Sequence, residues 1–218
     1  SSLYGGSALG GVINLISRTP KDEMEGEVLF NATSRNGQDL TSYFASPLTD
    51  ALSGSITAGA HHQKEQDLND DGWIDLAGYE RATIRPRFYW QGDEGANLYM
   101  TLGAMTEQRR GGTLDNRTTP DGASYPLNQD ALRTDLGFVY DSPVGETLNL
   151  NVRGSAMNLN HEHLFGDVIQ DDHHQSYLIE SSLSGYSDQI AWVVGAAYQS
   201  EQYKSDNFPE FNYNFESP

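Results

Sequence analysis

Residues 147–157 read TLNLNVRGSAM, and this stretch decides the fold. Leu148, Leu150 and Val152 alternate with polar residues. A period of two places the apolar side chains on one face of a β-strand and the polar side chains on the other. A tilted strand needs about ten residues to cross a bilayer, which is the length of this stretch. The pattern therefore predicts a membrane-crossing strand whose polar face lines an aqueous interior.

The same alternation recurs along the chain. It is clear in residues 81–91, 96–105, 131–140 and 189–199, and weaker in residues 25–35, 40–47, 52–61 and 177–186. Pro86 lacks a donor for the strand ladder, so a bulge or an edge is expected there. We predict an all-β fold: an antiparallel meander of about nine to ten strands that forms part of a transmembrane β-barrel.

The predicted connections alternate in length. The short ones are residues 48–52, 93–96, 144–147 and 187–190, and the long ones are residues 64–79, 111–130, 165–174 and those after Asp206. The first hairpin, at residues 36–39, is short where a long loop is expected. Short turns at one end and long loops at the other are typical of outer-membrane barrels.

Composition excludes several classes of protein. The 218 residues contain no cysteine, so there is no disulfide or thiolate chemistry. The formal net charge of −18 argues against nucleic acid as a partner. There is no HExxH motif and no Ser/His/Asp order that indicates catalysis, so we do not expect an enzyme. No apolar run is long enough for a transmembrane helix.

Residues 1–20, SSLYGGSALGGVINLISRTP, resemble the end of the plug domain of TonB-dependent outer-membrane receptors. The glycines permit tight turns, the run VINLI suits a short strand, and Pro20 ends it. The resemblance implies a seal between plug and barrel, formed by Tyr4, Gly5, Gly10, Gly11, Asn14 and Arg18. It also implies that residues 1–20 end the plug and that residues 21–218 begin an incomplete barrel, so the chain reads as a fragment.

By the same resemblance, the chain serves energy-coupled uptake of a scarce ligand, most often a ferric siderophore or similar metal complex. The implied partners are a TonB-type inner-membrane complex, reached through an N-terminal segment outside this chain, a small metal chelate and outer-membrane lipid. The implied place is the outer membrane of a Gram-negative bacterium. Two alternatives stay open: a passive porin or adhesin barrel, and a soluble calcium-stabilised β-domain that binds glycans.

Residues 67–75, DLNDDGWID, resemble a calcium loop in their spacing. Asp67, Asn69, Asp71 and Asp75 occupy positions 1, 3, 5 and 9, with glycine at position 6. Position 12 is Gly78 rather than glutamate, so the motif is incomplete. An acidic, turn-prone surface loop explains the same residues. The sequence requires no cofactor, and calcium in this loop is a hypothesis.

Five arginines fall on the predicted polar faces: Arg81, Arg85, Arg87, Arg133 and Arg153. Arginine pairs with carboxylates through two parallel hydrogen bonds. These residues can therefore form ion pairs with barrel acids such as Asp135, or guide an anionic ligand through the lumen. Of the histidines, only His161 and His163 have the spacing to bind a transition metal from one strand face.

Overall fold

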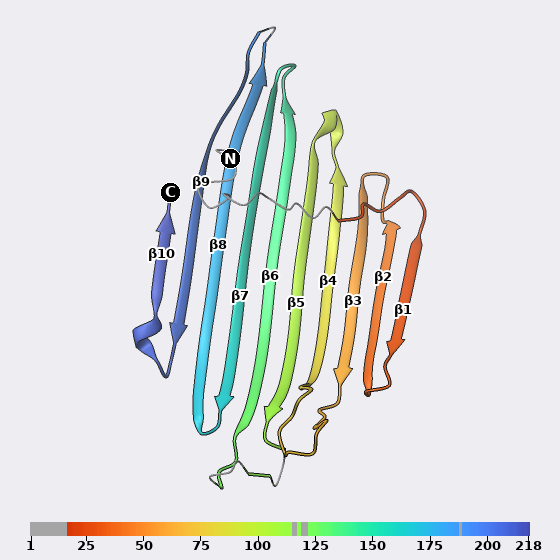
Figure 1. Ribbon diagram of the computed structural model, residues 1–218. Coiled ribbons are helices and arrows are strands. Elements are labelled where there is room, and N and C mark those ends of the chain that lie inside the picture. The colour runs from red at the N-terminus through yellow and green to blue at the C-terminus, as the bar shows by residue number, and fades with distance from the viewer. Residues whose placement is uncertain (1–16, 115–116, 119–121, 188) are drawn as a thin grey trace.

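The computed structural model describes residues 17–114, 117–118, 122–187 and 189–218, which form one antiparallel sheet (Figure 1). Ten strands follow one another in chain order, which confirms the predicted all-β meander. The strands are β1 Glu25–Ala32, β2 Gly37–Pro47, β3 Leu52–Gln63, β4 Gly78–Gln91, β5 Asn97–Gly112, β6 Pro126–Val144, β7 Leu148–Phe165, β8 Val168–Tyr186, β9 Ala191–Ser205 and β10 Tyr213–Ser217. None of the described helices has the length and apolar character needed to span a membrane.

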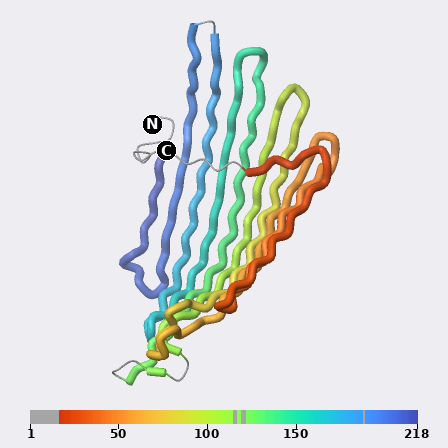
Figure 2. The backbone as a smooth tube through the Cα atoms, turned by 45° about the vertical axis from the view of Figure 1, so that its right-hand side comes forward, coloured from red at the N-terminus to blue at the C-terminus, as the bar shows by residue number. Residues whose placement is uncertain are grey.

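The sheet is curved and open (Figure 2). Each strand pairs only with its neighbours in sequence, so β1 and β10 are the two edges. The longest strands, β6 and β8, have 19 residues each. That is well beyond the roughly 9–11 residues a tilted strand needs to cross a bilayer, so the strands continue past the lipid.

The outward face of the sheet carries an apolar band. Because directly opposed residues share a face, the register places the members of this band together. Its members are exposed, large and apolar, and they include Ile84, Trp90, Met100, Leu102, Leu132, Leu136 and Ile179. Toward the long loops the same face becomes polar at one row of paired residues: Gln38, His62, Glu80, Gln108, Asp130, Glu162 and Asp171. We call this row the outward polar row, and we expect the apolar part of the bilayer to end near it.

The positions of the turns confirm most of the predicted alternation between short and long connections. The four short connections, between β2 and β3, β4 and β5, β6 and β7, and β8 and β9, all lie at the upper end in Figure 1. The connections between β3 and β4 and between β5 and β6 are long and lie at the opposite end. Residues 17–24 lead into β1 from the short-turn end (Figure 1).

The long loop predicted at residues 165–174 is wrong. Strands β7 and β8 are joined by Gly166 and Asp167 alone. Gly166 has a φ of 66°, which suits the first central position of a tight hairpin turn. The sequence analysis interpreted the polar residues on either side as a loop. They are instead paired residues of the two strands.

Two smaller expectations also need correction. No bulge forms at Pro86, because Ile84 to Arg87 face Ala104 to Thr101 residue for residue, and the ladder to β5 only lacks the pairs at Arg85 and Pro86. The residues after Asp206 are not all loop, since β10 pairs with β9. Most strands also extend further toward the long loops than predicted.

Candidate functional site

The candidate site is the inner face of the sheet, opposite the apolar band. The chain before β1 lies against this face. The Tyr89 hydroxyl donates a hydrogen bond of 3.1 Å to the carbonyl oxygen of Arg18. The Arg18 guanidinium lies over the ring of Tyr43, 5.3 Å from its centroid, and forms an ion pair with Glu25. These contacts make the inner face the lumenal side of the arc.

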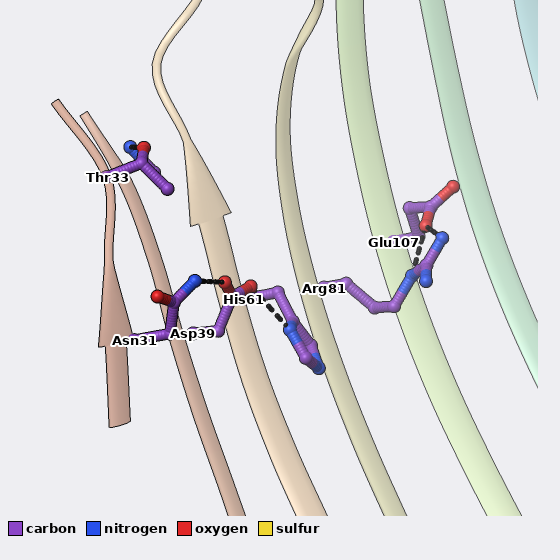
Figure 3. A network of polar contacts seen from close by, with 7 residues as sticks. Asn31, Thr33, Asp39, His61, Arg81 and Glu107 are labelled. Atoms are coloured by element: carbon purple, nitrogen blue, oxygen red, sulfur yellow. Dashed lines mark hydrogen bonds and ion pairs between the residues drawn. The ribbon is translucent and has the colours of Figure 1, made fainter. Parts of the chain in front are cut away.

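A polar row crosses the inner face toward the long-loop end (Figure 3). Asn31, Asp39, His61, Arg81 and Glu107 are consecutive partners across β1 to β5. Asp39 accepts hydrogen bonds from Asn31 at 3.0 Å and pairs with His61 at 2.9 Å. Arg81 pairs with Glu107, which is only 5% exposed and is also bound by Arg109. At one end of this row the carboxylate of Glu107 is therefore neutralised by Arg81 and Arg109.

The row continues into the second half of the sheet, where histidines gather. His161 lies opposite Asp172 across β7 and β8. The rings of His161 and His163 are 5.1 Å apart, and His163 stacks on Phe165. His174 pairs with Glu201 at 2.8 Å. Within the described ranges no three histidine or acidic side chains converge to hold a metal ion, so metal binding by His161 and His163 remains a prediction.

The centre of the inner face holds a two-pronged ion pair that spans three strands. Arg85 on β4 donates to both oxygens of Asp135 on β6, at 2.7 and 2.9 Å. Gly103 on β5 lies between them, and a Cβ there would come within 2.7 Å of Asp135 Oδ2 and of the Arg85 Cζ. Glycine suits this position because the ion pair passes directly over the backbone of β5, and any side chain there would displace it.

Four of the five predicted lumenal arginines are paired with acids. In addition to the pairs of Arg81 and Arg85, Arg133 lies 3.3 Å from Asp135 and Arg153 lies 2.8 Å from Glu180. The register confirms that all five share one face. Their pairing agrees with the interpretation as ion pairs with barrel acids. Guidance of an anionic ligand remains a prediction.

The acids that hold these arginines were only partly predicted. Asp135 was named from the sequence, whereas Glu107 and Glu180 were not. Glu107 lies on a different strand from Arg81, and Glu180 lies on a different strand from Arg153. Both pairings therefore depend on the register between strands. The parity of the alternation already placed both glutamates on the same face as the arginines, and it is the signal that could have found them.

The predicted seal is described only in part. Tyr4, Gly5, Gly10, Gly11 and Asn14 lie outside the described residues. Arg18 is described, and its contacts with Glu25, Tyr43 and Tyr89 fix the chain to the wall. A role of the other residues in a seal remains a prediction.

The loop at residues 67–75 is a tight turn closed by its own acids. Asp67 accepts hydrogen bonds from the backbone of Asn69 at 3.2 Å and Gly72 at 2.8 Å, and Asp75 accepts one from Leu68 at 2.7 Å. Burial alone would raise the pKa of Asp67, but these backbone donors outweigh it and hold the pKa below its ordinary value. Calcium would have to use the remaining lone pairs of Asp67, Asn69, Asp71 and Asp75, and its binding remains a prediction.

Comparison with known proteins gives two similarities. No protein-family model matches the sequence. Over 115 residues, half of the chain, it is 35% identical to the iron-regulated outer membrane virulence protein of Vibrio cholerae serotype O1, in both the O395 and N16961 strains. The match spans 17% of those relatives. The fold is similar to the crystal structure of the siderophore receptor PiuA from Acinetobacter baumannii, with a TM-score of 0.69.

The structural similarity has 14% sequence identity and covers 94% of this chain but 34% of the receptor. It therefore shows the fold alone: an arc of an antiparallel β-barrel. The apolar outward band and the relatives named for the outer membrane place the arc in that membrane. These features agree with the resemblance of residues 1–20 to the plug end of TonB-dependent outer-membrane receptors.

Proposed function

We propose that this chain belongs to a receptor that takes up a ferric siderophore or a similar metal chelate, driven by a TonB-type inner-membrane complex. The observation that supports this proposal most directly is the inner face, where a wall of polar and charged side chains faces the chain leading into β1. The named relatives support the substrate class, since one is called iron-regulated and the other a siderophore receptor. The chain spans about a third of that receptor structure, so the activity concerns the whole protein.

The wall chemistry fits a ligand that must move. Most of the arginines are neutralised by acids in place, so an anionic chelate meets hydrogen-bond donors without a trap of strong positive charge. Strong binding is then expected at loops and plug surfaces, whereas the wall provides weak, repeated contacts. Energy coupling would act through a segment that precedes the residues described here.

The test uses the full-length receptor in its own host. Deleting the gene should abolish growth on one ferric siderophore under iron limitation, and the complete gene should restore growth and uptake of radioactive iron. Uptake should stop when the proton gradient is collapsed, while binding of the chelate to cells persists. Normal iron uptake and growth in the deletion strain on every chelate tried would contradict the proposal.

A further inference from the structure

Arg87 differs from the other lumenal arginines. It lies on β4 of the inner face, two residues from Arg85, but no carboxylate pairs with it anywhere in the described ranges. Its one hydrogen bond is from Nη1 to the hydroxyl of Thr57, at 2.9 Å. Its Nε is buried and has no partner. Among the lumenal arginines that the structure describes, Arg87 is therefore the one that no acid neutralises.

Ser55 repeats this lack of a partner directly beside Arg87. The two residues are opposed across β3 and β4. Ser55 is only 6% exposed; its hydroxyl makes no hydrogen bond of standard geometry, although the hydroxyls of Tyr43 and Tyr89 lie close to it. A buried donor without a partner of good geometry is costly. An acceptor bound at this point of the wall would satisfy both the buried Arg87 Nε and the Ser55 hydroxyl.

The position of Arg87 and Ser55 in the sheet indicates where along the lumen such an acceptor would bind. Arg87 lies four residues from the end of β4, near the short-turn end of the sheet. Tyr89, two residues further along the same face, holds the carbonyl of Arg18. The pair therefore lies beside the point where the chain leaves the lumen, and far from the long loops.

We propose that Arg87, with Ser55 beside it, is a carboxylate-binding site on the lumenal wall near the exit of the barrel. A carboxylate suits a guanidinium because it can accept two parallel hydrogen bonds. Two sources can supply it: an acidic group on the transported chelate, or an acidic side chain of the receptor outside this chain. The first source rests on the proposed function, whereas the second does not.

The experiment uses the full-length receptor with Arg87→Gln, Arg87→Lys and, as a matched control, Arg110→Gln, which removes the same charge from the outward face. One arm measures iron uptake and chelate binding by whole cells. The other arm measures the melting temperature of the purified receptor in detergent without chelate. Thr57→Val tests whether loss of the single hydrogen bond of Arg87 is enough to explain an effect on melting.

If the chelate supplies the carboxylate, Arg87→Gln lowers uptake about tenfold, the size of one charge-assisted contact, while surface binding and melting stay unchanged. If the receptor supplies it, Arg87→Gln lowers the melting temperature by several degrees and Thr57→Val does not. Arg87→Lys restores part of either loss. The proposal is overturned if Arg87→Gln matches Arg110→Gln in both arms, or if Thr57→Val reproduces its whole effect. If the wild-type receptor takes up no iron, the proposed function is contradicted, but the melting temperatures of the variants still test whether the receptor supplies the carboxylate.

Discussion

Asp135 and Leu136 are neighbours in β6, yet they face different surroundings. Leu136 points outward, is 44% exposed and belongs to the apolar band. Asp135 points inward and is held by Arg85 and Arg133. The outward face gains its stability from lipid, which the chain itself does not supply, whereas the inner face is stabilised by ion pairs between strands. One strand can supply both the apolar outward face and the charged inner face because its successive side chains point to opposite faces.

The largest expected effect is a charge in the apolar band. Leu136→Arg should destabilise the full-length barrel in vesicles by about 2–4 kcal/mol, because a cation there loses its hydration near the bilayer centre. Gln108→Arg, in the outward polar row, is the matched control and should cost about 0–1 kcal/mol. Denaturant unfolding in lipid measures both. Equal losses would show that the outward polar row does not mark the edge of the bilayer.

The next effect tests the inner face. Gly103→Ala should cost about 1–2 kcal/mol, because its methyl group separates Arg85 from Asp135, both of which are partly shielded from water. Gly137→Ala is the control, since a Cβ there has only ordinary contacts of 3.5 Å or more. In an Asp135→Asn background the cost of Gly103→Ala should shrink. An unchanged cost in that background would mean that the ion pair does not cause the requirement for glycine.

A smaller effect is expected for an exposed ion pair on the same face. The side chains of Arg153 and Glu180 are 45% and 28% exposed. Water screens such a pair, so Arg153→Gln should change the unfolding free energy by less than about 1 kcal/mol. The same denaturant measurement applies. A loss as large as that of Gly103→Ala would mean that exposure does not rank the inner-face pairs.

The smallest effect is local to the loop at residues 67–75. The pKa of Asp67 lies below its ordinary 3.8, so its hydrogen bonds stabilise the loop at neutral pH and are lost as the pH falls through that lowered pKa. Asp67→Asn should speed proteolysis of the loop at neutral pH, whereas Asp70→Asn should not. Similar cleavage rates for the two variants would contradict this account. Adding calcium to the same assay tests the calcium hypothesis, which requires slower cleavage of the unmodified loop.

The sequence predicted the strands more reliably than their ends. Alternation in residues 147–157 is strong because lipid and water select opposite residue types on the two faces. At the outward polar row the polar residues Glu162 and Asp171 stand on the otherwise apolar face, so the alternation no longer separates strand from loop there. The partners Glu107 and Glu180 depend on register, which follows from turn geometry across the whole sheet. Arg87 could not be distinguished from Arg85 before the register was known.

Gly103 has a consequence for how this wall can evolve. Three strands contribute to one contact, so none of the three positions can change freely while the other two stay the same. Relatives that carry a larger residue at position 103 should also have lost the arginine at 85 or the aspartate at 135. Relatives that keep both charges should keep the glycine. An alignment of homologous barrels should therefore show these three columns varying together, although they lie far apart in sequence.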